Sequence, residues 1–84
     1  MSSENNPGTG IVELDVRPQL RAGEEPFSII MDTFKNLQPG ETFVLHAIMK
    51  PAPLIPLLEG KGYISTCEQV SSDHWIVTFV PQTN

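Results

Sequence analysis

The chain has little sulfur chemistry available to it, because its 84 residues include a single cysteine, Cys67. One cysteine excludes an intrachain disulfide framework and any Cys-x-x-Cys site. No apolar run approaches the roughly 18 residues of a membrane span, and the first residues lack the basic and apolar segments of a signal peptide. We therefore expect a cytoplasmic protein in a reducing environment.

Positive charge is also scarce. Five Lys and Arg residues stand against ten Asp and Glu residues, which gives a net charge of −5. The basic residues are scattered along the chain and form no cluster. Because an acidic surface repels phosphate backbones and anionic lipids, we expect neither nucleic-acid binding nor membrane binding.

The chain is long enough for one domain only. Residues 1–10, MSSENNPGTG, are polar, contain glycine and proline, and show no periodicity, which predicts a disordered tail. Residues 11–82 are then left to form a single small domain with one core.

Hydrophobic periodicity along residues 11–82 predicts the element order β-α-β-α-β-β. Each strand–helix–strand step should be a right-handed crossover, so both helices should lie on one face of the sheet. The predicted fold is a two-layer α/β sandwich, of the α+β type, with a four-stranded mixed sheet whose other face is open. The expected elements are a strand over 11–16, a helix from Pro26 to Leu37, a strand over 41–48, a helix from Ala52 or Pro53 to Gly60, and strands over 63–70 and 74–80.

Both helices are expected to bury an apolar stripe, while the open sheet face keeps an apolar patch of its own. The stripe of the first helix consists of Phe27, Ile30, Met31, Phe34 and Leu37. The second helix should bury Leu54, Leu57 and Leu58. The outward patch consists of Val44, Ile48, Ile76 and Val80, which suggests an association surface and a monomer or weak homodimer.

Two short motifs carry a resemblance to a known family. The first strand ends in LDVR, residues 14–17, and the Pro-started helix is followed by PGE, residues 39–41. In this order they resemble the TusA/SirA-like family of small sulfur-carrier proteins over residues 13–81. The resemblance implies an LDxRGxxCPxP stretch, in which a cysteine at the start of the first helix accepts a persulfide sulfur.

That reactive cysteine has no counterpart here. The family's Cys-Pro-x-Pro falls on GEEP, residues 23–26, where Gly23 takes the place of the cysteine and only Pro26 is retained. A thiol at a helix N-terminus is activated by backbone N–H groups and the macrodipole, but Glu24 and Glu25 occupy this end and would repel an anionic persulfide. The chain is most similar to an uncharacterised, often bacterial, branch that lacks the cysteine.

From this loss we expect a non-catalytic adaptor that is related to sulfur-relay proteins, needs no cofactor and binds a protein or small-molecule partner. Paired catalytic carboxylates need a pocket and opposed pKa values, which adjacent exposed glutamates do not supply. The expected binding residues lie in the loop before the first long helix: Arg17, Arg21, Gly23, Glu24, Glu25 and Pro26.

Two alternatives stay open at the level of sequence. Cys67 lies within a predicted strand, where a lone cysteine usually packs as a small core residue. It is also the one thiol of the chain, so a sulfur-carrier or redox protein that uses Cys67 is the first alternative. His46 and His74 are expected on the open sheet face, where they are either solvated or ligands of a copper or zinc ion. Their spacing matches no zinc signature.

Overall fold

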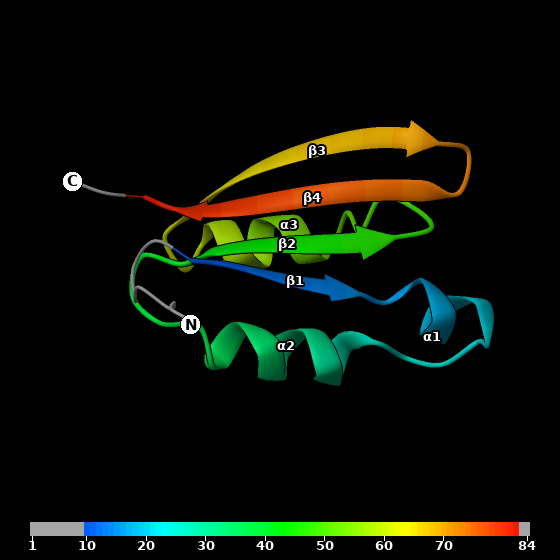
Figure 1. Cartoon of the computed structure of the whole chain (residues 1–84), viewed down its shortest axis with the longest axis horizontal. Helices are drawn as coiled ribbons and strands as arrows, with labels where there is room; N and C mark the ends of the chain where they lie inside the picture. The colour runs from blue at the N-terminus through cyan, green and yellow to red at the C-terminus, as the bar shows by residue number, and fades with distance from the viewer. Residues whose placement is uncertain (1–9, 83–84) are drawn as a thin grey trace, which may run out of the picture.

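A computed structural model describes residues 10–82 of the chain, in which four strands form one sheet in the order β1-β2-β4-β3 (Figure 1). β1 runs parallel to β2, and β4 runs antiparallel to both β2 and β3. This confirms the predicted mixed sheet. The predicted tail over residues 1–10 falls outside the described residues, apart from Gly10. The strands are β1 (Ile11–Asp15), β2 (Thr42–Ala47), β3 (Tyr63–Ser71) and β4 (His74–Pro81).

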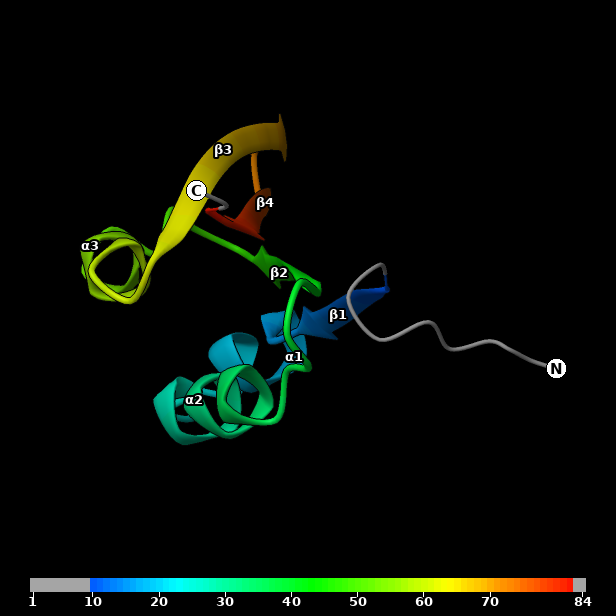
Figure 2. The ribbon, with the colours of Figure 1, turned by 90° about the vertical axis from the view of Figure 1, so that its left-hand side faces the viewer.

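Two helices cover one face of the sheet, as predicted. They are α2 (Phe27–Lys35) and α3 (Leu54–Glu59). Figure 2 shows both on the same side of the strands, with α2 beside β1 and α3 nearer to β3. Within residues 10–82 the opposite face carries no helix, so the two-layer α/β sandwich with an open sheet face is the observed architecture.

A third, short helix was not predicted. α1 (Arg17–Arg21) follows β1 directly, in a segment for which the sequence indicated a loop. Pro18 is compatible with this helix because it lies in the first turn, where its missing N–H group is not needed. The half-buried Leu20 packs against the core, and its amide donates to the carbonyl oxygen of Val16 at 3.0 Å. Packing of Leu20 thus favours a helical turn over an open loop.

The core lies between the sheet and the two longer helices. Strand register stacks it in layers, because Val12 and Leu14 of β1 face Phe43 and Leu45 of β2, and Phe43 faces Phe79 of β4. The rings of Phe43 and Phe79 stack with their centroids 5.9 Å apart. The buried residues are Val16, Ile30, Phe43, Leu45, Ala47, Leu54, Leu58, Val77 and Phe79.

Three details of the helices differ from the prediction. Pro26 is the N-cap of α2 rather than its first helical residue. Phe27, the first member of the expected stripe, is 48% exposed, because it lines a groove between α2 and α3. Leu57 is 39% exposed, whereas Ile55, which was not in the predicted stripe, packs against the core.

Candidate functional site

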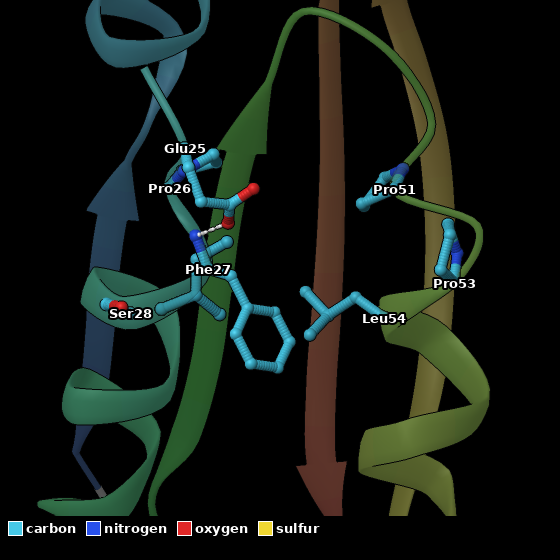
Figure 3. Close-up of a pocket in the computed structure, with 8 residues that line it drawn as sticks. Glu25, Pro26, Phe27, Ser28, Pro51, Pro53 and Leu54 are labelled. Carbon is cyan, nitrogen blue, oxygen red and sulfur yellow. Dashed lines mark hydrogen bonds between the residues drawn. The ribbon is translucent and has the colours of Figure 1, made fainter.

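A groove opens between the beginnings of α2 and α3, at the end of the sheet to which the parallel strands β1 and β2 both point (Figure 3). The chain leaves β1 through α1 to reach α2, and leaves β2 through a proline-rich segment to reach α3. The groove has a volume of about 510 Å³, within the range of ligand pockets in proteins. Its lining residues are Glu25, Pro26, Phe27, Ser28, Ile30, Pro51, Pro53 and Leu54.

The wall on the α2 side is set by a local hydrogen bond. The Glu25 carboxylate accepts a hydrogen bond from the backbone N–H of Phe27, so it satisfies one of the unpaired donors at the start of α2. Glu25 is one of the two glutamates that the sequence placed at this helix end. Figure 3 shows the Phe27 ring projecting from α2 into the space between the two helices.

The wall on the α3 side is built from prolines. Pro51 and Pro53 precede the helix, and Pro53 is its N-cap. Because a proline ring fixes φ, this wall has few conformations to lose when something binds against it. Leu54, which is 5% exposed, belongs to the core and forms the apolar side of the groove below the two prolines. The groove is therefore apolar and rigid.

Polar chemistry in the groove is limited to one carboxylate and one hydroxyl. Among the lining residues only Glu25 and Ser28 carry polar side chains, and both are exposed. Such a lining binds an apolar group and can pair a positive charge with Glu25 at the rim. Among the eight lining residues, Glu25 is the single carboxylate and no histidine accompanies the hydroxyl of Ser28.

The structure divides the six predicted binding residues. Glu25 and Pro26 line the groove, whereas Arg17 and Arg21 are engaged in ion pairs away from it. Gly23 has φ = 78°, a left-handed conformation that glycine tolerates and other residues rarely adopt. Their common role in binding stays a prediction, and Glu24 is exposed.

Arg17 and Asp15 form the strongest ion pair near this end of the sheet. Nη2 of Arg17 lies 2.8 Å from Oδ2 of Asp15, and its Nε lies 3.0 Å from Oδ1. The side-chain hydrogen bond from Arg17 lowers the pKa of Asp15 from 3.8 to about 2. The same contact raises the pKa of Arg17. Arg21 meets Asp73 of the β3–β4 turn at 3.2 Å, so α1 is joined to the hairpin at its far end.

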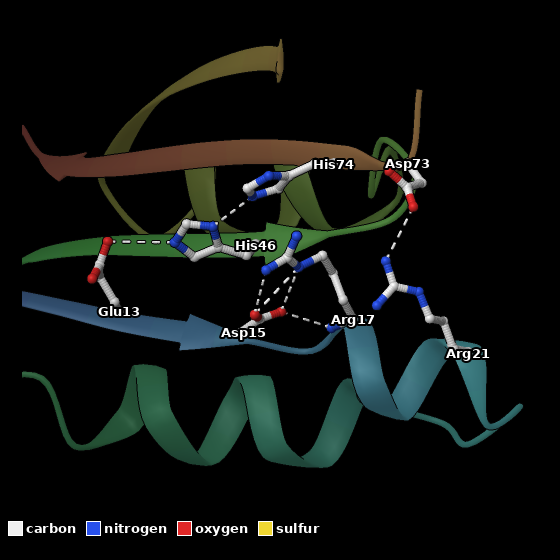
Figure 4. A network of polar contacts seen from close by, with 7 residues as sticks. All are labelled: Glu13, Asp15, Arg17, Arg21, His46, Asp73 and His74. Carbon is white, nitrogen blue, oxygen red and sulfur yellow. Dashed lines mark hydrogen bonds and ion pairs between the residues drawn. The ribbon is translucent and has the colours of Figure 1, made fainter. Parts of the chain in front are cut away.

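A row of three polar side chains crosses the open face (Figure 4). Nδ1 of His46 lies 2.9 Å from Nε2 of His74, and Nε2 of His46 lies 3.4 Å from Oε2 of Glu13. The sequence had placed both histidines on this face and had turned Glu13 toward water, but it gave no sign of the contacts between them. The sheet register brings these side chains together. His46 is paired with Asp15 of β1 and with Ile76 of β4. Glu13 and His74 each lie two residues before one of these partners, so they are diagonal neighbours of His46 on the same face.

Cys67 lies on the helix-covered face of β3, half-buried against the core, as expected of a small core residue. In the sheet, β2 and β4 separate β3 from β1 and from the start of α2 that the sulfur-carrier arrangement would use. Within residues 10–82, no three His, Cys, Asp or Glu side chains gather into a group that could hold a metal ion. None of the helices in this range has the length and apolar character needed to span a membrane.

The residues that sequence reasoning missed are those of the α3 wall and Phe27. A signal for them existed, because three prolines within six residues, 51–56, leave the start of α3 rigid and without some of its amide donors. The sequence did not reveal that this segment would face Glu25 across a groove, since that depends on how the two crossovers are placed.

Comparison with protein-family models gives one match: residues 13–81 match the family described as uncharacterized conserved protein (DUF2249). Comparisons with curated proteins and with solved structures gave no match.

Proposed function

The chain belongs to the family of uncharacterised conserved proteins DUF2249, and we propose that it is a non-catalytic binding domain. Its groove takes an apolar side chain of a partner protein, next to a basic residue of the same segment. The observation that carries the proposal is the rigid apolar groove of about 510 Å³ between α2 and α3.

A protein segment suits this groove better than a polar metabolite does. Small polar ligands are usually oriented by several convergent polar groups, whereas here Glu25 and Ser28 are the polar side chains of the lining. Phe27 is 48% exposed although it lines the groove, so apolar surface is open to a partner there. The net charge of −5 favours a basic partner segment over an acidic one.

The relation to TusA/SirA-like sulfur carriers is part of the same proposal, with binding retained and sulfur transfer lost. The backbone at Gly23 supports the loss, because a cysteine at φ = 78° would be strained. Cys67 offers no substitute at the groove, since it lies in β3, at the opposite edge of the sheet from β1, and does not line the groove. We therefore propose an adaptor in which the loop before α2 contacts a partner instead of carrying a persulfide.

Peptide display against the immobilised domain, followed by NMR mapping of the enriched peptides, tests the proposal. We expect enriched peptides to combine an aromatic or aliphatic residue with a neighbouring Lys or Arg. They should shift the amide resonances of Phe27, Ser28 and Leu54. Phe27→Ala should weaken their binding about tenfold, as loss of a well-packed apolar contact does.

Leu57→Ala is the matched control, because Leu57 is a comparably exposed apolar residue that lies outside the groove. It should leave the affinity unchanged. Glu25→Gln should reduce the preference for basic peptides while apolar binding persists. The proposal is wrong if no peptide is enriched, if the shifts map to the open face, or if Phe27→Ala and Leu57→Ala behave alike.

A further inference from the structure

The two histidines of the chain meet on the open face, away from the groove, and this contact is independent of the function proposed above. His46 comes from β2 and His74 from β4, and their nearest ring nitrogens, Nδ1 and Nε2, are 2.9 Å apart. Ile76 is the residue directly opposite His46, so His74 is its diagonal neighbour on the same face. Two adjacent strands of the sheet thus hold the rings in place.

Glu13 fixes the direction in which the His46 ring presents its free lone pair. Its Oε2 lies 3.4 Å from Nε2 of His46. An ionised carboxylate only accepts hydrogen bonds, so Nε2 carries the proton and Nδ1 keeps a lone pair that faces His74. A carboxylate against the outer nitrogen of a histidine is the arrangement that orients metal-binding imidazoles in proteins.

The ligand type indicates the class of ion, because imidazole nitrogens suit transition metals and bind Cu(II) most tightly among the divalent ions. Imidazole nitrogens bind a transition metal at about 2.0–2.1 Å. Two such nitrogens in neighbouring positions of a square-planar site are therefore about 2.9 Å apart, whereas a tetrahedral site would separate them by about 3.3 Å. In the structure, the 2.9 Å separation is that of an N–H···N hydrogen bond, and the ring centroids 5.2 Å apart show that the two nitrogens point at each other. Both rings therefore have to turn before their lone pairs converge on an ion.

We propose that Nδ1 of His46 and Nε2 of His74 are the two protein ligands of a Cu(II)-class divalent ion on the open face. Water completes the coordination, because residues 10–82 provide no group of three potential ligands. Without the ion, Nε2–H of His74 donates to Nδ1 of His46. With the ion bound, His74 takes its other neutral tautomer and carries the proton on Nδ1.

The surrounding charges also favour a cation. Glu13 and Asp15 bring two carboxylates to this part of β1, and Arg17 neutralises one of them by pairing with Asp15. Glu13 is 64% exposed at its side chain, and the His46 side chain is 19% exposed. The pair is therefore held by the sheet yet remains open to the solvent from which an ion would enter.

Titration of the intact protein with CuCl₂, followed by calorimetry and electron paramagnetic resonance, tests the proposal. We expect one equivalent of Cu(II) to bind with a spectrum typical of two equatorial nitrogen ligands. His46→Gln and His74→Gln should each weaken Cu(II) binding about tenfold or more, because a single imidazole then binds the ion without the chelate effect of the pair. Glu13→Gln should weaken it by about tenfold, the lower end of the effect of losing an orienting carboxylate.

Cys67→Ala separates this site from thiol binding and should leave the affinity and the nitrogen signals unchanged. Backbone amide spectra of every variant establish that the sheet is intact. Absence of binding overturns the proposal, as does binding that survives both histidine substitutions or disappears in Cys67→Ala. In that case the histidine contact is only a hydrogen bond that joins β2 to β4.

Discussion

The helix-covered face of the sheet buries aromatic and aliphatic side chains, whereas the open face carries imidazoles and carboxylates between half-exposed aliphatic residues. Neighbouring residues of β2 show the contrast, since Phe43 is fully buried and Val44 is half-buried on the other side. Both faces come from one alternating pattern, but only the covered face has a second layer to pack against. The free energy of unfolding should therefore depend mainly on the covered face. Residues of the open face contribute less to it, so they are available for binding.

The same difference separates the two proposed sites. The groove lies between the beginnings of two helices on the covered side, and the proposed partner would be held there mainly by apolar contact. The histidine row exists because the open side has no layer that would bury it, and its chemistry depends on paired ring nitrogens. Substitutions on one face should leave the site on the other face intact.

The largest expected effect tests the difference between the faces within one strand. Phe43→Ala should cost about 3–5 kcal/mol, because a fully buried ring is replaced by a cavity. That is most of the stability of a domain this small, so the variant should be largely unfolded. Val44→Ala, on the open face, should cost no more than about 1 kcal/mol. Urea denaturation followed by circular dichroism measures both, and similar losses would mean that the two faces contribute alike.

The fold could be predicted because its determinants are local. Alternation of apolar and polar residues over 11–16 and 42–47 indicates strands. Gly40 of the PGE motif has φ = 85° and lies in the turn between α2 and β2. Handedness of the crossovers then places both helices on one face. α1 was missed because its stability comes from Leu20 packing against the core, and no pattern within five residues shows such a contact.

The candidate sites could be predicted only in part, because they depend on register and on the gap between helices. Sequence placed Glu25 and Pro26 at the start of α2, and they do line the groove. It could not show that Pro51 and Pro53 face them. It likewise placed His46 and His74 on one face, but the diagonal contact requires the register of β2 against β4.

The next effect concerns the connection that leads from the open-face ion pairs to the groove. Gly23→Ala should cost about 1–2 kcal/mol, because φ = 78° is unfavourable for any residue with a Cβ atom. Nothing lies within 4 Å of the added atom, so the cost is that of the backbone alone. Gly60→Ala is the control, since Gly60 has φ = −66°, and it should change the free energy of unfolding by less than about 0.5 kcal/mol. Equal losses would show that the Gly23 conformation is not the cause.

A smaller, pH-dependent effect is expected at Asp15. Its pKa in the folded protein is about 2, below the ordinary 3.8, so Asp15 contributes stability above pH 4 that is lost as the pH falls toward 2. Solvent screening limits the contribution of this exposed pair to about 0.2–1 kcal/mol. Asp15→Asn should therefore lower the free energy of unfolding at pH 7 and leave it unchanged near pH 2. A difference that is constant over this range would contradict the assigned pKa.

The smallest effect is expected where α1 meets the β3–β4 turn. Arg21 and Asp73 are 53% and 65% exposed at their side chains, so Arg21→Ala should leave the urea midpoint unchanged. The pKa of Asp73 should nevertheless stay below its ordinary value in this variant, because the larger cause is the hydroxyl of Ser71, which donates to Oδ1 at 3.1 Å. Ser71→Ala should raise that pKa more than Arg21→Ala does, as NMR titration of the carboxyl carbon would measure. The opposite order would mean that the ion pair with Arg21, rather than the turn itself, is the larger cause of the lowered pKa of Asp73.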